Sequence, residues 1–411
     1  MINIAYYTQL KNKIKELTPY NAYGLEWNQT DDTLRRLGKA DGLTAGTDFD
    51  NITPWMMKRC NLTDGGTVNN FYGETGYAED GSNGQVMVRI PKFYYRSVHY
   101  TNDNDKEIYR WWISEEYQEG FEVHPAFVKG DEVLDYIYIG AYEATVYDDS
   151  AASYVGDGIT YDYDNDIMAS VADLQPISGD NDHLDILEAR QLAENRGIGW
   201  TQQSFNAISA VQLLYSIEYA DFNIQNTISE GITNLDSGSN NHSQNTGHTN
   251  SLGNDSGEVV IGTLENGATG DTETYAMSYR GIENLFGNIW NFVDGIFIKD
   301  DGYYIENDPS NWNSDGTGYN HISTSPINSD GYIDNIEYLN DMNYSFLGKS
   351  TDGGSSTELS DYQWSHDSGE VNIARVGGSW RIGLQAGCFC WGLYHVASAS
   401  IRSRGARLLF K

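Results

Sequence analysis

The chain has 411 residues and a formal net charge of -34, with 30 tyrosines, ten tryptophans and 43 glycines beside only seven prolines. Disordered acidic chains lack such aromatic residues, so this composition predicts a folded, turn-rich, mostly β protein that is long enough for a sizeable core. An acidic surface repels nucleic acid and anionic membranes over a Debye length, which argues against phosphate-backbone binding as the main activity.

Cysteine content and the first residues indicate where the protein is made. Three cysteines, Cys60, Cys388 and Cys390, cannot form a disulfide framework. The opening MINIAYYTQLKNK has no apolar stretch of signal-peptide length, and no run approaches a transmembrane span. We therefore expect synthesis in a cytoplasm, no membrane insertion, and release by lysis or within a particle.

The first expected element is a short N-terminal helix. An apolar stripe at spacings of three or four runs from Tyr7 to Leu17, and Pro19 ends it. Such a stripe suits a helix that meets copies of itself, or a helix packed on its own domain.

Strands and turns are expected next, from about residue 23 to residue 147. Val86, Val88 and Ile90 alternate as in a half-buried strand. We place a domain boundary near Gly130, which divides the chain into residues 1–130 and 131–411.

Two helices and a polar loop follow. The first helix is expected from about Asp182, which caps its amide groups, to Arg196, with Gly197 as a left-handed stop. The second carries a wide apolar face between residues 205 and 222, suited to packing on a sheet. The loop at about 236–257 is rich in Ser, Asn and Gly and is expected not to pack.

The last 41 residues differ in chemistry from the rest of the chain. They contain six Arg or Lys residues and no Asp or Glu, and Asn372 is the last asparagine. From Gly387 onward the segment mixes Cys, Gly, Tyr, His, Val, Ile and Arg without helical or strand period. Selection for something other than packing is therefore expected here.

Three motifs occur in order, YRGIENLFGNIWNFVDG at 279–295, RVGGSWRIG at 375–383 and GARLLF at 405–410, and IYIGAYEATVY precedes them. This order resembles the C-type-lectin-like fold shared by formylglycine-generating enzymes and by the variable proteins of diversity-generating retroelements, including phage tropism determinants. The resemblance covers about residues 133–411. It implies an α+β, β-rich chain, with a C-type-lectin-like domain after a β-rich N-terminal region that starts with a short helix.

Several motif residues are expected to serve the scaffold. Gly287 and Gly378 suit close backbone approach, and Trp290 and Trp380 suit large core plates whose indole N–H needs a partner. A further set is expected to bond loops together rather than touch a ligand: Asn288, Asp294 and Arg375.

The enzymatic branch of the resemblance can be tested on residues. In formylglycine-generating enzymes two cysteines follow the GGS-aromatic motif, and Ile382 and Gly387 occupy those positions here. Without both thiols the copper-dependent sulfur chemistry is lost. Cys388 and Cys390 are interpreted as incidental, because we expect them to be poorly placed for a shared metal or a disulfide. An enzyme with a divergent site stays an alternative, which a cleft lined by these two thiols would support.

The retroelement branch explains the composition of the tail. In that family asparagine codons are rewritten at adenines, and the residue types that result account for almost all residues between Trp380 and Gly405. We call the residues expected to stay fixed the frame: GGSW at 377–380, Gly383, Ala386, Gly387, Trp391, Leu393 and GARL at 405–408. We call the rewritten, ligand-binding positions the variable set: Arg381, Ile382, Leu384, Cys388, Cys390, Gly392, Tyr394, His395, Val396, Ile401, Arg402 and Arg404.

The resemblance implies a phage tail receptor-binding protein in the virion, made in the host cytoplasm, that binds a bacterial surface protein or glycan and catalyses nothing. Tyr394, His395, Arg402 and Arg404 would be its aromatic and cationic anchors, with arginine favouring a carboxylate, phosphate or sulfated sugar. A homotrimer is expected by resemblance. Residues 1–130, where YGLEWNQTDDTLRRLG resembles tail-fibre segments, would contact other tail proteins. A structural tail or baseplate protein and a polysaccharide depolymerase are the alternatives.

No cofactor is expected. Asp162, Asp164 and Asp166 alternate like the start of a calcium loop, but the glycine and distal glutamate of an EF-hand are absent. Structural calcium stays an alternative to a solvated turn at this place.

Overall fold

The computed structural model describes residues 20–179, 184–235, 242–266, 270–365 and 369–411. The predicted helix at Tyr7–Leu17 lies outside the described residues. Most of the chain forms antiparallel sheets with few helices, as the composition predicted. Within these ranges, no helix combines the length and the apolar character needed to cross a membrane.

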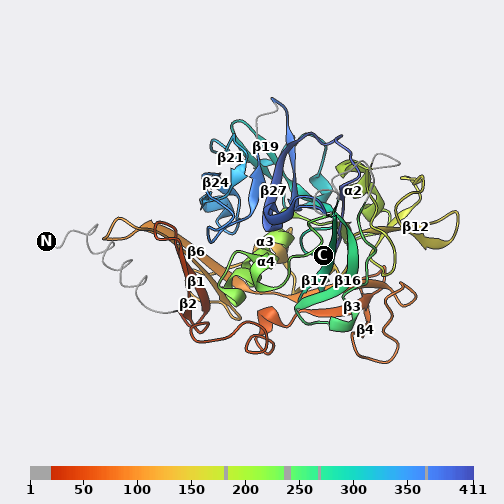
Figure 1. Ribbon diagram of the computed structural model, residues 1–411, viewed down its shortest axis with the longest axis horizontal. Helices are drawn as coiled ribbons and strands as arrows, with labels where there is room; N and C mark the ends of the chain where they lie inside the picture. The colour runs from red at the N-terminus through yellow and green to blue at the C-terminus, as the bar shows by residue number, and fades with distance from the viewer. Residues whose placement is uncertain (1–19, 180–183, 236–241, 267–269, 366–368) are drawn as a thin grey trace.

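A five-stranded antiparallel sheet is built from the first part of the chain, in the order β2-β1-β7-β6-β8. Its strands are β1 Tyr23–Asn28, β2 Thr33–Gly38, β6 Tyr94–Thr101, β7 Glu107–Ser114 and β8 Glu122–Val123. This sheet lies at the red and orange end of the molecule in Figure 1.

A six-stranded sheet joins segments from both sides of residue 130, in the order β15-β29-β11-β5-β3-β4. Its strands are β3 Lys58–Leu62, β4 Val68–Phe71, β5 Gln85–Pro91, β11 Tyr136–Gly140, β15 Trp200–Gln202 and β29 Leu408–Phe410. Val86, Val88 and Ile90 are buried as predicted, but Met87 is buried as well, so β5 is covered on both faces and not half-buried. The assignment of separate roles to 1–130 and 131–411 stays a prediction.

An eight-stranded sheet contains most of the C-terminal segment, in the order β21-β20-β19-β26-β27-β25-β22, and β28 also pairs with β19. Its strands are β19 Trp290–Lys299, β20 Gly302–Ile305, β21 Asn320–Ser323, β22 Gly331–Tyr332, β25 Tyr362–Trp364, β26 Asn372–Gly377, β27 Gly387–His395 and β28 Arg404–Gly405. The pairing of β25 with β27 is parallel, and the 22 residues between these strands give the chain the length to cross over.

Smaller sheets and short 3-10 segments make up the rest of the regular structure. The remaining strands are β9 Val128–Lys129, β10 Glu132–Val133, β12 Thr145–Asp148, β13 Ser153–Val155, β14 Ile167–Ala169, β16 Gly257–Asn266, β17 Gly270–Tyr279, β18 Ile282–Glu283, β23 Asn335–Ile336 and β24 Gly348–Ser350. The 3-10 segments are η1 Thr53–Trp55, η2 Pro125–Phe127, η3 Asn250–Leu252, η4 Pro309–Asn311, η5 Asn340–Met342 and η6 Gly383–Gln385.

The first predicted helix is α2, Ile186–Glu194, and it starts later than expected. Asp182 lies outside the described residues, and the cap is Asp185, whose carboxylate accepts the N–H groups of Leu187 and Glu188. Glu188 closes the capping box on the Asp185 N–H. The helix ends at Glu194 with Asn195 as its cap, two residues before the predicted end, although Gly197 has a φ of +121° that favours glycine.

The second predicted helix is α3, Phe205–Tyr219, and it is buried on every side rather than on one face. It packs against β1 and β7 of the five-stranded sheet and against β19 of the eight-stranded sheet. Trp55 donates to the Leu214 carbonyl, and Gln212 donates to the Cys388 carbonyl. Figure 1 shows α3 and the short α4, Ile224–Thr227, in the middle of the molecule between these two sheets. The helix is therefore the core that both sheets share.

The polar loop packs more closely than its composition predicted. Residues 236–241 are outside the described residues, but Thr246 and Thr249 are buried. Thr249 donates its hydroxyl to Glu283 and accepts a hydrogen bond from Arg59. Hydrogen bonds thus fix this loop in the way that apolar contacts fix others.

His124 is a fully buried titratable group in the first part of the chain. Its ring lies against those of Phe93, Tyr95 and Tyr344, and its Nδ1 accepts the N–H of Ala126. Its Nε2 has no hydrogen-bond partner among the residues that the structure describes. Burial, with a smaller effect of Lys411, lowers the pKa of His124 to about 3.

This depressed pKa predicts a loss of stability in mild acid. Below pH 6.5 the unfolded chain binds a proton on His124 that the folded chain refuses until about pH 3. We expect this one group to lower the free energy of unfolding by about 1.4 kcal/mol per pH unit within that window. His124→Asn keeps an acceptor for the Ala126 N–H and cannot titrate. Urea unfolding of both proteins at pH 6 and pH 5 measures the effect, and a constant difference between them would contradict it.

Candidate functional site

The twelve residues of the variable set differ widely in exposure. Three are exposed: Arg381, Leu384 and Ile401. Five are half-buried: Ile382, Tyr394, His395, Val396 and Arg402. Four are buried: Cys388, Cys390, Gly392 and Arg404. The buried four correct the prediction that the whole set faces a ligand, because their side chains are covered by the protein itself.

Three of these four residues lie on β27 and Arg404 lies on β28, and their positions in the eight-stranded sheet cover them. Gly392 lies opposite Arg375 on β26, and a Cβ on Gly392 would lie 2.4 Å from the Arg375 Nε. Arg404 lies opposite Trp290 in the β19–β28 pairing, and it donates to the Ala399 carbonyl. These positions hold the sheet together at its centre.

The frame is almost wholly interior. Every frame residue except Gly383 is buried. At Gly387 a Cβ would lie 2.1 Å from the carboxylate of Asp361, which accepts the Phe389 N–H at 2.7 Å. Gly378 has a φ of +82°, which favours glycine. The sequence division into frame and variable set therefore matches burial at the frame, and at eight of the twelve variable positions.

The two tryptophans of the motifs are core plates, as predicted. Trp380 is fully buried with Ile232, Leu235 and Ala276. Its indole N–H was expected to find a partner, but within the described ranges it has none. Trp290 is 4% exposed and faces Arg375.

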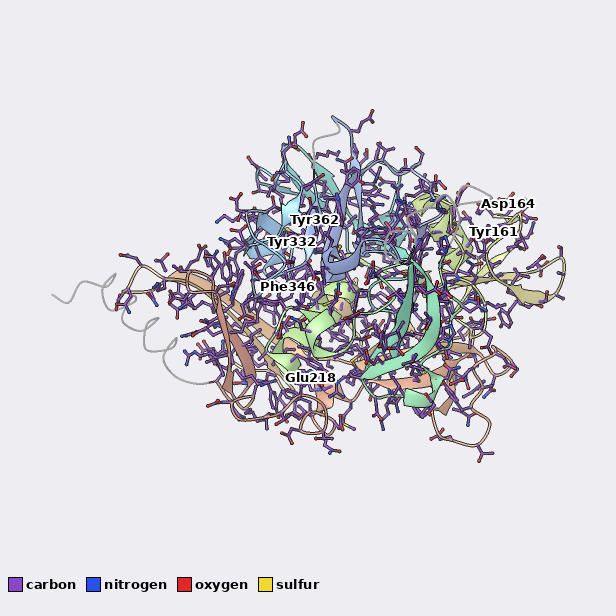
Figure 2. The ribbon with its side chains drawn as sticks, viewed as in Figure 1. Tyr161, Asp164, Glu218, Tyr332, Phe346 and Tyr362 are labelled. Carbon is purple, nitrogen blue, oxygen red and sulfur yellow. The ribbon has the colours of Figure 1, made fainter. Side chains whose placement is uncertain are left out.

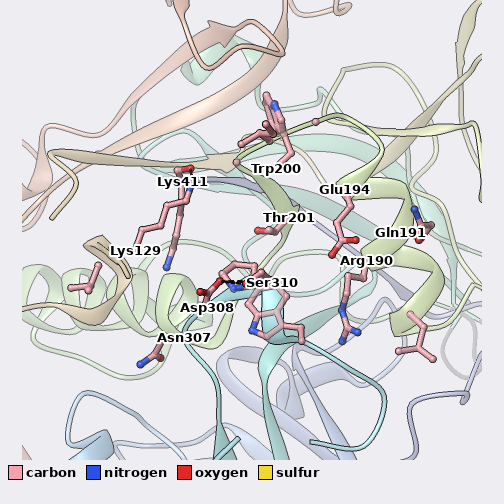
Figure 3. Close-up of a pocket in the computed structure, with 17 residues that line it drawn as sticks. Lys129, Arg190, Gln191, Glu194, Trp200, Thr201, Asn307, Asp308, Ser310 and Lys411 are labelled. Carbon is pink, nitrogen blue, oxygen red and sulfur yellow. Dashed lines mark hydrogen bonds between the residues drawn. The ribbon is translucent and has the colours of Figure 1, made fainter. Parts of the chain in front are cut away.

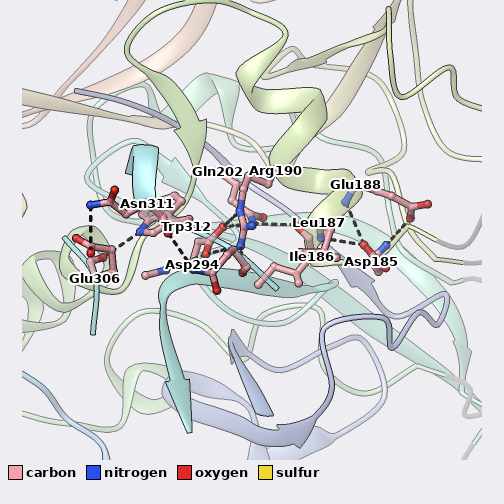
Figure 4. Close-up of polar contacts among 12 residues, drawn as sticks. Asp185, Ile186, Leu187, Glu188, Arg190, Gln202, Asp294, Glu306, Asn311 and Trp312 are labelled. Atoms are coloured by element: carbon pink, nitrogen blue, oxygen red, sulfur yellow. Dashed lines mark hydrogen bonds and ion pairs between the residues drawn. The ribbon is translucent and has the colours of Figure 1, made fainter. Parts of the chain in front are cut away.

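Asn288 and Asp294 bond separate segments together, as predicted. Asn288 donates its amide to Glu143 and to the Gln244 carbonyl. Asp294 accepts two hydrogen bonds from Arg190 of α2, at 2.7 and 2.9 Å, which Figure 4 shows at the centre of a polar network. These contacts tie the two-helix region to the eight-stranded sheet.

Arg375 acts differently from the prediction, because it is held by rings and not by loops. Its guanidinium carbon lies 4.6 Å from the centroid of the Trp290 ring and 5.1 Å from that of Tyr394. Arg375 is 3% exposed. Burial lowers the pKa of its guanidinium, and the neighbouring Tyr394 opposes that shift. Arg375 thus joins the two halves of an aromatic row.

Sequence reasoning missed three members of this row: Tyr332, Tyr362 and Trp364. Trp290 contacts Trp364 at 5.5 Å between ring centroids, Trp364 contacts Tyr362 at 4.4 Å, and Tyr362 contacts Tyr332 at 5.2 Å. At the other end the rings of Tyr394 and His395 lie 3.9 Å apart. We call these residues with Arg375 the aromatic row: Tyr332, Tyr362, Trp364, Trp290, Arg375, Tyr394 and His395.

The row crosses the eight-stranded sheet from β22 through β25 to β27. Tyr332 pairs with Tyr362, and Trp364 lies opposite Gly392. Figure 2 shows Tyr332 and Tyr362 next to each other beside the blue C-terminal strands. All members except Trp290 and Arg375 are half-buried, so their rings take part in the surface. The alternation Tyr-Gln-Trp at 362–364 is the one sequence signal for it.

Positive charge collects at the Arg375 end of the row. Burial, and then the neighbouring charges of Arg375 and Arg381, lower the pKa of Arg404. The Nε atoms of Arg375 and Arg404 have no hydrogen-bond partner in the part of the chain that the structure describes. The charge of the neighbouring Arg381 lowers the pKa of both Arg375 and Arg404.

The two thiols of β27 do not form a reactive site. Both are fully buried and free, so no disulfide joins them. Burial, with a smaller effect of Asp361, raises the pKa of Cys388 and of Cys390 well above its ordinary value. Nucleophilic and metal-binding thiols need the opposite shift.

The acidic ladder is a hydrogen-bonded turn. The carboxylate of Asp166 accepts the N–H groups of Asp149 and Asp162, and that of Asp162 accepts the Asp164 N–H. Asp164 lies at the outer edge of the molecule in Figure 2. Among the described residues, no group of three or more His, Cys, Asp or Glu side chains is placed to hold a metal ion.

A separate pocket of about 750 Å³ lies between α2, the turn before β15, η4 and β9 (Figure 3). Its wall combines the cations Lys129, Arg190 and Lys411 with the acids Glu194 and Asp308. None of its lining residues belongs to the variable set. Charges of both signs do not select one class of ligand, so the aromatic row with its arginines is the stronger candidate.

Comparisons with known proteins give one distant likeness. No protein-family model and no curated protein sequence matches the chain. Its structure is similar to solved structures of the Major Tropism Determinant P3c, U1 and M1 variants, at 15%, 14% and 15% sequence identity and TM-scores of 0.28, 0.30 and 0.28. Each match covers 90% of this chain and 73% of the other. The motifs of the sequence resemble the same group of proteins, and a likeness at these TM-scores assigns neither a family nor a function.

Proposed function

We propose that this chain is a phage tail receptor-binding protein that holds a host bacterial surface molecule on the outer face of its eight-stranded sheet. The proposal includes a C-type-lectin-like fold for residues 131–411, a place at the tail tip, assembly as a homotrimer, and attachment to other tail proteins through residues 1–130. Binding occurs without chemistry. The name of the three similar structures agrees with this proposal and does not carry it.

The observation that carries the proposal is the division of one segment into a buried frame and a displayed set. Between Gly377 and Leu408, all frame residues but one are interior, while eight variable positions reach the surface. A fixed interior allows the exposed side chains to change without unfolding the sheet. Several copies in one particle would turn weak single contacts into firm adhesion.

A cell-binding experiment tests the proposal. The purified full chain, fluorescently labelled, is incubated with a panel of bacterial strains, and bound fluorescence is measured. We expect Tyr394→Ala and Arg402→Ala to lower binding to the positive strains by roughly tenfold, as at interface hot spots. Tyr117→Ala is the control, because this tyrosine is 68% exposed and lies outside the proposed face.

Two outcomes would count against the proposal. Binding to no strain at all would favour a structural tail protein, and equal losses for Tyr394→Ala and Tyr117→Ala would remove the face from the binding role. The DNA beside the gene offers an independent check of diversification. We expect a near-copy of codons 375–411 with AAC or AAT at the exposed variable positions, close to a reverse transcriptase gene.

A further inference from the structure

We propose that the aromatic row and the arginines at its end bind an acidic glycan, with sugar rings on the aromatic side chains and a sugar carboxylate at Arg381. This inference rests on the proposed function and names the ligand class of the same face. The proposed ligand is a carbohydrate, and the experiment below can show instead that the ligand is a protein.

The shape of the row favours a chain of sugar rings. Tyr332, Tyr362 and Trp364 contact one another in sequence on two paired strands, with ring centroids 5.2 and 4.4 Å apart and ring planes inclined by 79° and 44°. Aromatic faces are negative at their centres and attract the weakly positive C–H bonds on one side of a sugar. Such contacts use the face of the sugar ring and not a single polar atom, so they depend little on how the sugars are linked.

The arginines favour an anionic group on that glycan. Arg381 is exposed, and its charge lies close enough to Arg375 and Arg404 to lower their pKa values. Arg375 and Arg404 are 3% and 2% exposed, so they supply positive charge from inside and Arg381 supplies the contact. Burying a cation is costly even where rings and a carbonyl contact it, and a carboxylate that arrives at Arg381 compensates part of that cost.

The rest of the protein does not prevent this attraction. The net charge of -34 repels anions at long range, but salt at 0.1 M screens exposed charges beyond about 10 Å. Asp330 acts on Tyr362, at the opposite end of the row from Arg381. One carboxylate of the glycan is therefore placed at the arginine end, and the sugar chain extends from there toward Tyr332.

Polysaccharides of different charge test the inference, and two of them, dextran sulfate and neutral dextran, share one backbone. The full chain is titrated with oligogalacturonate, dextran sulfate and neutral dextran while tryptophan fluorescence and heat of binding are recorded. We expect oligogalacturonate to bind, with Arg381→Ala weakening it by roughly tenfold or more and Tyr332→Ala weakening it as well. Arg35→Ala is the matched control, since Arg35 has an exposed side chain on the other sheet.

Each remaining outcome decides the question. Three results would overturn the proposal of a sugar carboxylate at Arg381. These are no binding of oligogalacturonate, equal binding of neutral dextran, and tighter binding of dextran sulfate. On the strains that bind the protein, periodate oxidation of surface sugars should abolish binding and protease treatment should spare it. The reverse pattern would contradict a glycan ligand but not the receptor-binding function. Binding to no strain would contradict the receptor-binding function itself.

Discussion

Replacing Asp294 by alanine is expected to lower the free energy of unfolding by about 3–5 kcal/mol, because it leaves a buried guanidinium without its counter-charge. Asp294 is 1% exposed and Arg190 is 9% exposed in their side chains. The carboxylate also accepts the Gln202 amide at 2.7 Å and the Gly295 N–H at 2.9 Å. Figure 4 shows Arg190 and Gln202 converging on Asp294. Chemical denaturation followed by tryptophan fluorescence measures the loss.

The control is an ion pair of similar length at the surface. Arg35 donates to Glu26 at 2.6 Å, but the Arg35 side chain is 63% exposed and Arg110 also binds Glu26. Arg35→Ala should therefore cost less than about 1 kcal/mol. If both variants lost the same stability, burial of the Asp294 pair would not be what holds α2 on the sheet.

The sequence predicted the helices well and their surroundings poorly. Spacings of three and four residues identified α3, because helical period is a local property. The pattern could not reveal that α3 is covered on all sides, since its second cover is the five-stranded sheet, built mainly from residues 23–114. In the same way, β5 carried an alternating pattern of valines, and only the pairing with β3 and β11 shows why Met87 is buried too.

The candidate site was predicted in part, for a related reason. The composition of the tail identified the segment that holds Arg381 and Tyr394, because residue composition is visible in one chain. It did not identify Trp364 or Tyr332, which reach the same face through a parallel pairing and an antiparallel pairing between distant segments. Cys388 and Cys390 were assigned to the ligand by composition, yet strand position buries them.

Replacing Trp380, a buried residue of the frame, by alanine is expected to lower the free energy of unfolding by a similarly large amount. Trp380 is fully buried against Ile232, Leu235 and Ala276, and its carbonyl accepts the Leu235 N–H at 2.6 Å. Removing a buried tryptophan side chain costs the transfer of its apolar surface and leaves a cavity, about 3–5 kcal/mol in total. We expect urea unfolding to show this decrease in the free energy of unfolding.

Leu384, four residues later in the chain, provides the matched comparison. It belongs to the variable set and is 65% exposed, so Leu384→Ala should change stability by less than about 0.5 kcal/mol. A protein that diversifies its binding face needs this asymmetry, because substitutions at displayed positions must leave the fold intact. A large loss in Leu384→Ala would mean that the loop between the GGSW motif and β27 supports the fold, and the division into frame and variable set would fail at that position.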